Sequence, residues 1–264
     1  MSPAAVFFWH SQTPDWFNMT ARPPFLITTS WDDGTVHDLK LAELLSKYEL
    51  PATFYVAKRH PYGSLEESEL RVLAQSFELG AHTLNHVVLD SVPDELAEAE
   101  IRNSKAWIEQ LSGHQCRVFC FPRGKFSNRH VQMVKGARFS GARSVELMSF
   151  RAASVVSGLA VMPTTIQAFP HKTSSYLKNM FRRRRISNLL NYLHADKKDW
   201  TTMASSLLSC VSSHGGAFHL WGHAWEIEQF NLWSDLEQLF QTLEQCKRQA
   251  TFVSNADFCT GVVS

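Results

Sequence analysis

Two adjacent carboxylates, Asp32 and Asp33, followed by Gly34, are the first residues in this 264-residue chain that could do chemistry. Neighbouring carboxylates repel each other unless positive charge lies beside them, and a divalent metal ion commonly supplies it. Adjacent side chains diverge, so one could bind an ion while the other faces a reacting water. An Asp before a helix can instead cap it by accepting backbone N–H bonds, and on its own the pair fits that structural role better.

A second candidate group is the pair His82 and His86, four residues apart. On a helical turn this spacing places both imidazoles on one side, where they can reach one ion. With a carboxylate they form the two-histidine, one-carboxylate set of a catalytic zinc site, which leaves a position for water. Two unrelated surface histidines are the alternative for the pair alone. The double aspartate upstream, also after a predicted strand, makes a metal site the better interpretation.

A third group lies in the predicted strand that ends at His223. In a strand, His219, Trp221 and His223 share one face. A histidine at the strand end could serve as a general acid near neutral pH, because its reference pKa is close to 6.5. We expect His223 to have this role and His219 to be a core histidine with its hydrogen bonds satisfied.

These groups must be positioned by the elements that precede them, and the hydrophobic pattern predicts alternating strands and helices. Strands are expected at residues 25–31, 52–56, 78–83, 117–122, 141–145, 217–222 and 251–254, with an extended segment at 159–169. Helices are expected at residues 39–48, 66–77, 128–137, 173–194, 200–213 and 232–247, and between Pro93 and Gly113.

This alternation predicts a single α/β domain, and we expect a distorted (β/α) barrel of about seven parallel strands over residues 25–264. Residues 1–24 are expected to form an irregular lead-in. An open doubly wound sheet is the alternative. The candidate polar residues follow strands, and the carboxyl ends of barrel strands are where barrel enzymes carry their active sites. The glycine-rich fingerprints of dinucleotide and phosphate loops are missing from the sequence.

Composition limits the class of protein further. The formal net charge of +1 argues against a general nucleic-acid binder, and 44% hydrophobic residues suffice for a large core. Five scattered cysteines suggest reduced thiols. No signal peptide or membrane span is recognised, so a cytoplasmic protein is expected. The run Arg182–Arg185 is most simply a solvated face, although peripheral contact with a membrane or an anionic glycan is an alternative.

The three groups, in this order, resemble the polysaccharide deacetylases of carbohydrate esterase family 4, which include chitooligosaccharide deacetylases. The family's Thr-Phe-Asp-Asp-Gly motif is similar to Ser30–Gly34, and its His-x-x-x-His motif corresponds to His82–His86. Looser matches are Phe119–Gly124, for a motif ending in Pro-x-Gly, and Leu220–His223, for a late Leu-x-His strand.

The resemblance implies that Asp33, His82 and His86 bind a divalent metal, most simply Zn²⁺, that Asp32 is the general base, and that the late histidine, His223, is the general acid. The chain departs from the family at Cys120, where many members carry an Arg that orients the base. Arg123 or Arg151 would then have to take over that task. Asp199 and Trp200 are a weak match to the family's Asp-Trp motif.

The resemblance thus implies a hydrolase that removes the N-acetyl group from an amino sugar in a glycan or glycoconjugate precursor. A deformylase, another small-molecule amidase on the same metal site, or a catalytically silent carbohydrate-binding protein are the alternatives. We expect the substrate to contact Pro122, Arg123, Gly124, Trp221, Trp225 and His171.

Overall fold

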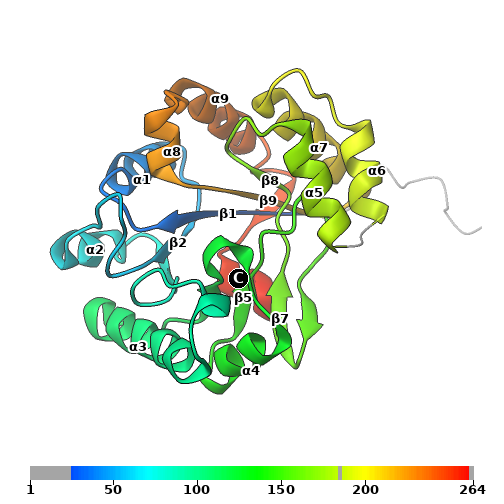
Figure 1. Ribbon diagram of the computed structural model, residues 1–264. Coiled ribbons are helices and arrows are strands. Elements are labelled where there is room, and N and C mark those ends of the chain that lie inside the picture. The colour runs from blue at the N-terminus through cyan, green and yellow to red at the C-terminus, as the bar shows by residue number, and fades with distance from the viewer. Residues whose placement is uncertain (1–24, 184–185, 262–264) are drawn as a thin grey trace, which may run out of the picture.

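Short buried strands alternate with amphipathic helices in this computed structural model, which describes residues 25–183 and 186–261 (Figure 1). The strands are β1 (Phe25–Asp33), β2 (Thr53–Val56), β3 (Glu78–Ala81), β4 (Val118–Cys120), β5 (Gly141–Arg143), β6 (Ser154–Val156), β7 (Leu159–Met162), β8 (Ile166–Gln167), β9 (Gly216–Gly222) and β10 (Ala250–Phe252). The α-helices are α1 (Asp38–Lys47), α2 (Glu67–Leu73), α3 (Asp94–Ser112), α4 (Asn128–Gly136), α5 (Thr173–Arg183), α6 (Ile186–His194), α7 (Trp200–His214), α8 (Ala224–Gln229), α9 (Trp233–Glu244) and α10 (Asn255–Thr260).

All ten strands belong to one sheet, in the order β6-β7-β5-β4-β3-β2-β1-β9-β8, with β10 added beside β1. β1 is the central strand: its first half pairs with β10, its second half pairs with β2, and β9 runs along its other side. Every pairing is parallel except that of β6 with β7. Parallel pairing brings the carboxyl ends of the strands to one rim, where the candidate residues lie.

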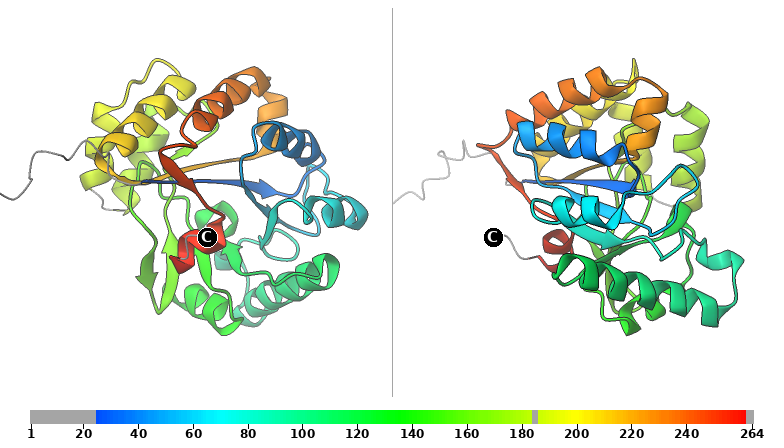
Figure 2. Two further views of the ribbon diagram at one scale, coloured as in Figure 1. Left: turned by 180° about the vertical axis from the view of Figure 1, so that it is seen from behind. Right: turned by 90° about the vertical axis from the view of Figure 1, so that its left-hand side faces the viewer.

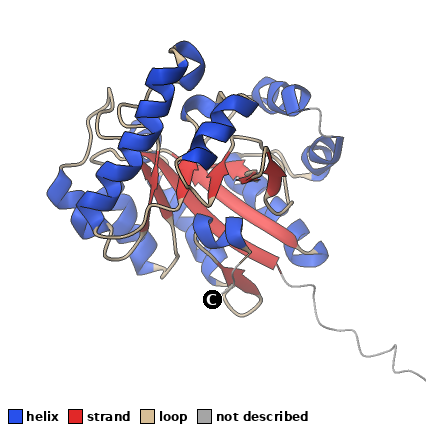
Figure 3. Cartoon of the chain, turned by 90° about the horizontal axis from the view of Figure 1, so that it is seen from below, coloured by secondary structure: helices blue, strands red, loops and turns tan. Residues whose placement is uncertain are grey.

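The sheet curls, and most of the helices lie around its outside (Figures 1 and 2). Seen from below, the long strands cross the middle of the molecule between helices (Figure 3). Within the described residues no strand pairing joins β6 to β8, the two ends of the sheet. The predicted α/β domain with a distorted, mostly parallel barrel is therefore confirmed, and the barrel is incompletely closed.

The core between the sheet and the helices is built on large side chains that are removed from water. Trp31 of β1 and Leu41 of α1 are fully buried, and Phe240 of α9 meets the Trp31 ring edge-on at 6.1 Å between centroids. Burying one such side chain stabilises the fold by about 1.5–3 kcal/mol. This packing fixes β1, and with it the two aspartates at its end.

A second, smaller core lies inside the curl of the sheet and includes Tyr55, Met162 and Phe258. α10 packs against β1, β5 and β7. Its first residue, Asn255, takes a hydrogen bond from the Tyr55 hydroxyl at 2.9 Å and donates from its own backbone to Thr53 Oγ1, at the start of β2. α10 therefore closes the amino-terminal end of the curled sheet, opposite the rim that carries the candidate residues.

The structure differs from the predicted elements at several places. β6 and β7 form a hairpin that was predicted only in part; Ser157 and Gly158 both have positive φ, as a two-residue turn between twisted strands requires. The helical stretch predicted at residues 173–194 is two helices, α5 and α6, and the short helices α8 and α10 were not predicted. The predicted lead-in, residues 1–24, lies outside the described residues.

Two further findings concern the cysteines and the lengths of the described helices. All five cysteines are free thiols. Among the described helices, none is both long enough and apolar enough to cross a membrane.

Candidate active site

Asp32 and Asp33 end β1 with both side chains buried, each 2% exposed. In a regular strand they would point to opposite faces, but the φ of Asp33 is 88°, in the left-handed region that non-glycine residues rarely adopt. Both carboxylates consequently line the same cavity. A strained backbone held by the surrounding fold is common where side chains must be aimed at a reaction centre.

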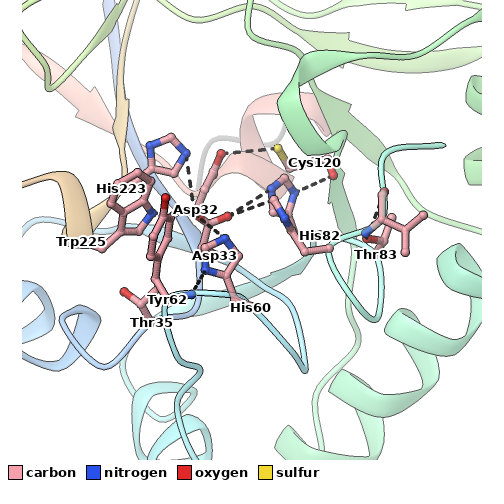
Figure 4. A network of polar contacts seen from close by, with 12 residues as sticks. Asp32, Asp33, Thr35, His60, Tyr62, His82, Thr83, Cys120, His223 and Trp225 are labelled. Carbon is pink, nitrogen blue, oxygen red and sulfur yellow. Dashed lines mark hydrogen bonds and ion pairs between the residues drawn. The ribbon is translucent and has the colours of Figure 1, made fainter. Parts of the chain in front are cut away.

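The structure brings the three predicted metal ligands together; Asp33 and His82 are labelled in Figure 4. Asp33 Oδ1 lies 3.6 Å from His82 Nε2 and 3.3 Å from His86 Nε2. The same oxygen is buried and has no hydrogen-bond donor within the described part of the chain. Because an unpaired buried carboxylate oxygen is costly, and two imidazole nitrogens face it, this donor set fits a divalent cation.

The two histidines are not on a helical turn, so that part of the prediction is wrong. They lie in a loop after β3, in which Thr83 and His86 have φ values of 58° and 54°. Glu100 of α3 holds this loop: its carboxylate accepts hydrogen bonds from the backbone and the side chain of Asn85, at 2.8 and 2.7 Å. The four-residue spacing therefore brings the imidazoles together through left-handed backbone turns rather than through helical periodicity.

The surroundings of both histidines favour the neutral imidazole, which is the form that can bind a metal ion. His82 Nδ1 lies 2.9 Å from the carbonyl oxygen of Cys120, which fixes the proton on Nδ1 and leaves the Nε2 lone pair for an ion. Burial lowers the pKa of His82, and it lowers the pKa of His86 to about 4. Both imidazoles are therefore neutral at physiological pH, which is the form that binds metal.

Asp32 is oriented by Arg143, which the sequence did not indicate. This fully buried side chain at the end of β5 donates from Nη2 to Asp32 Oδ2, and also to Cys120 Sγ at 2.7 Å. The two arginines that were expected to orient Asp32 lie elsewhere. Arg151 pairs with Glu146, and Arg123 is exposed at the cavity wall. Asp32 Oδ1 remains without a hydrogen-bond partner among the described residues.

His223 follows β9 and forms a dyad with Glu226 of α8, their Nδ1 and Oε2 atoms lying 2.6 Å apart. Burial disfavours the charged imidazole, but the hydrogen bond to Glu226 and the charges of Asp33, Glu226 and Asp32 outweigh it and raise the pKa of His223 to about 9. His223 is therefore protonated at neutral pH.

Asp199, the weak match to the family's Asp-Trp motif, is the N-cap of α7 and accepts a hydrogen bond from the backbone N–H of Thr202, so this match is wrong.

A cavity of about 480 Å³ opens over these groups. Of the residues predicted to contact substrate, Arg123, His171, Trp221 and Trp225 line it, whereas Pro122 and Gly124 form the buried turn behind Arg123. His171 Nε2 donates to Gln167 Oε1 at 2.7 Å, and Gln167 Nε2 in turn donates to Glu226 Oε2. His219 is a core residue as expected, bonded to Ser30 and to the Pro163 carbonyl.

Sequence reasoning missed several residues of the site, among them His60, Tyr62, Arg143 and Glu226. His60 and Tyr62 follow β2, so the rule that pointed to polar residues after strands could have found them. Glu226 lies three residues after His223, within reach on one helical turn. Nothing in the local pattern around Arg143 singles it out.

Comparison with known proteins agrees with this geometry. Residues 20–142 match the family model described as polysaccharide deacetylase. A peptidoglycan-N-acetylglucosamine deacetylase of Bacillus cereus is 30% identical over 91 residues, covering 32% of this chain and 40% of that protein. This chain thus matches less than half of the curated relative's length.

Solved structures share the fold at low identity. A family 4 carbohydrate esterase from Bacillus anthracis has 17% identity and a TM-score of 0.56, over 90% of this chain and 84% of that chain. The chitin deacetylase of Colletotrichum lindemuthianum has 13% identity and a TM-score of 0.56, over 90% and 89%. A Mycobacterium smegmatis protein has 11% identity and a TM-score of 0.63, over 99% and 94%. Residues 20–142 are thus similar to the polysaccharide deacetylase family, and the solved structures share the fold of the chain.

Proposed function

We propose that this protein is a metal-dependent hydrolase that removes the N-acetyl group from an amino sugar in a glycan or glycoconjugate precursor. The observation that carries the proposal is the surroundings of Asp33 Oδ1, which has two neutral imidazoles beside it and no hydrogen-bond partner among the described residues. One oxygen and two nitrogen donors suit Zn²⁺, which we propose as the ion.

When bound, the ion polarises the amide carbonyl and eases deprotonation of the attacking water. Arg143 holds Asp32 Oδ2, so Oδ1 is the free oxygen that takes a proton from this water. The water oxygen bonds to the carbonyl carbon. When the C–N bond breaks, the nitrogen keeps the electron pair and takes a proton from His223 Nε2, which releases an amine and acetate.

The walls of the cavity support an amino sugar as substrate. Tyr62 and Trp225 lie with ring centroids 4.4 Å apart at one side, and both line the cavity together with Trp221. Aromatic faces combined with a few polar side chains, here Arg123 and Asn179, are typical of sites that orient a small ligand. The cytoplasmic location and the peripheral contact through Arg182–Arg185 stay predictions; Arg184 and Arg185 lie outside the described residues.

The test is release of acetate and of formate from a panel of N-acylated amino sugars, short glycans and glycolipids. We expect acetate release by the Zn²⁺-loaded protein, loss of at least about 10²-fold in Asp32→Asn because the general base is gone, and no change in Asp199→Asn, which alters an exposed carboxylate on α7. Formate as the main product would favour a deformylase. Release of neither acid from any substrate, or equal activity in Asp32→Asn, would overturn the proposal.

A further inference from the structure

The two oxygens of Asp33 have different surroundings (Figure 4). Oδ1 faces His82 and His86 and has no hydrogen-bond partner among the described residues, as above. Oδ2 accepts a hydrogen bond from Trp225 Nε1 at 2.8 Å and lies 3.3 Å from His60 Nε2. Among the described residues Oδ1 thus has no hydrogen-bond donor, whereas Oδ2 accepts a hydrogen bond from Trp225 and has the Nε2 atoms of His60 and His223 beside it, at 3.3 and 3.9 Å.

The hydrogen bonds of His60 define which of its nitrogens carries the proton. The backbone N–H of Tyr62 donates to His60 Nδ1 at 3.4 Å, so Nδ1 is the acceptor and the proton of the neutral ring is on Nε2. His82 is the opposite case, because its Nδ1 faces a carbonyl oxygen. His60 therefore presents an N–H to Asp33, whereas His82 presents a lone pair.

The His60 ring is held in place independently of any ion. Its side chain is 4% exposed, its backbone N–H donates to Ser64 Oγ at 2.9 Å, and its ring meets that of His86 edge-on, with centroids 4.7 Å apart. On the other side of Asp33, the Trp225 indole can only donate, and it rests on the Tyr62 ring. Loop 57–66 and α8 therefore contact the same oxygen, Asp33 Oδ2, from two sides.

We propose that His60 and Trp225 are positioning residues that occupy Oδ2 of Asp33, so that Asp33 binds the metal through Oδ1 alone. Distance by itself would also admit His60 as a ligand, since one donor atom each of Asp33, His60 and His86 lie within 4.8 Å of one another. The hydrogen bond to Nδ1 argues against this, because it places the proton on the nitrogen that would have to bind. The inference rests on the metal site of the proposed function.

The test measures the dissociation constant of Zn²⁺ by competition with a chromogenic chelator, without substrate. Trp225→Phe keeps an aromatic ring against Tyr62 but removes the donor, and His60→Phe removes the other donor. Loss of a residue that hydrogen-bonds to a metal ligand typically weakens metal binding by about 10–100-fold. We therefore expect Zn²⁺ affinity to fall by this factor in each variant. His60→Gln keeps an N–H donor and should therefore recover most of the Zn²⁺ affinity that is lost in His60→Phe.

Trp233→Phe is the matched control, because Trp233 also donates its indole N–H to a carboxylate, that of Glu228, at 2.6 Å, but on the protein surface. It should leave Zn²⁺ affinity unchanged. Circular dichroism establishes that each variant folds. Unchanged affinity in folded Trp225→Phe and His60→Phe would overturn the inference.

X-ray absorption at the zinc edge separates the two roles of His60. We expect two imidazole ligands per ion in the unmodified protein, and two again in His60→Gln. Three in the unmodified protein and two in the variant would make His60 a ligand and overturn the inference while leaving the metal site intact. Failure of the unmodified protein to bind Zn²⁺ at all would instead overturn the proposed function.

Discussion

Arg143 is the residue on which the proposed base depends most directly. Its guanidinium is fully buried, lies over the rings of Tyr55 and Trp221 at 5.3 and 4.6 Å from their centroids, and donates to Asp32. Removing one partner of a buried ion pair leaves the other charge uncompensated, which typically costs about 3–5 kcal/mol. Arg143 is thus placed to support both the fold and the orientation of the base.

We expect Arg143→Gln to lower the melting temperature and to lower kcat by about 10²-fold, because Asp32 loses its orientation. Zn²⁺ affinity should change little, since Arg143 contacts neither Asp33 nor the histidines proposed to bind the metal. Arg143→Lys, which restores the charge without the fork geometry, should recover part of kcat. Thermal denaturation and steady-state kinetics check this, and a folded Arg143→Gln protein with full kcat would contradict it.

The dyad of His223 and Glu226 leads to a prediction about pH. The pKa of His223 is raised to about 9, so the imidazole is protonated below that pH and loses its proton as pH rises through it. If the protonated form is the general acid, activity must fall on the alkaline side. Glu226→Gln removes the negative charge that favours protonation, and the alkaline limb of the kcat/KM profile should move to lower pH. An unmoved limb would exclude His223 as the acid.

At the residue scale, sequence reasoning found the groups whose chemistry is unusual and whose spacing is local. Asp33, His82 and His86 were selected because carboxylate and imidazole side chains follow strands, and the structure places the Nε2 atom of each histidine within 3.6 Å of Asp33 Oδ1. Arg143 could not be selected in the same way. It reaches Asp32 from a strand that is not adjacent to β1, through the interior of a curled sheet whose curvature no local pattern specifies.

At the scale of elements, the loop after β3 shows how a correct residue prediction can rest on the wrong local structure. His82 and His86 were expected on a helical turn, yet Thr83 and His86 adopt left-handed backbone conformations. The conformation is imposed from outside by Glu100, which is 6% exposed on α3. Long-range side-chain to backbone hydrogen bonds of this kind leave no periodic signal in the sequence.

We expect Glu100→Ala to loosen this loop, because it leaves the backbone N–H and the amide of Asn85 without their acceptor. Two lost hydrogen bonds to a charged group correspond to about 3 kcal/mol or more of local stability. Zn²⁺ affinity should fall about 10-fold or more, as for other outer partners of metal ligands. Competition titration measures this; Glu98→Ala, an exposed change on the same helix, is the control. Equal affinity in both variants would contradict the role given to Glu100.

At the scale of the whole molecule, strand and helix alternation predicted the fold class, because buried parallel strands and amphipathic helices have different periods. The same rule missed α10 and the β6–β7 hairpin. Both are short, and their positions depend on the curl of the sheet: α10 fills its amino-terminal end. The curl of the sheet thus depends on packing between segments that are far apart in the sequence, which a local pattern does not reveal.

The metal should also stabilise the molecule, because its proposed ligands come from β1 and from the loop after β3. An ion present at about 1,000 times its dissociation constant adds about 4 kcal/mol to the free energy of unfolding. For a domain of this size that corresponds to a rise in melting temperature on the order of 10 °C. Differential scanning calorimetry with and without a chelator checks this. Asp33→Ala should show no difference between the two conditions.

The measurement that tests the central claim most directly is a titration of the metal-free protein with Zn²⁺, with acetate release from an N-acetylated amino-sugar substrate as the readout. We predict that the rate rises linearly and stops rising at one ion per chain, and that Asp33→Ala stays at the background throughout. Full acetate release by the metal-free protein, or an equal response in Asp33→Ala, would contradict the account.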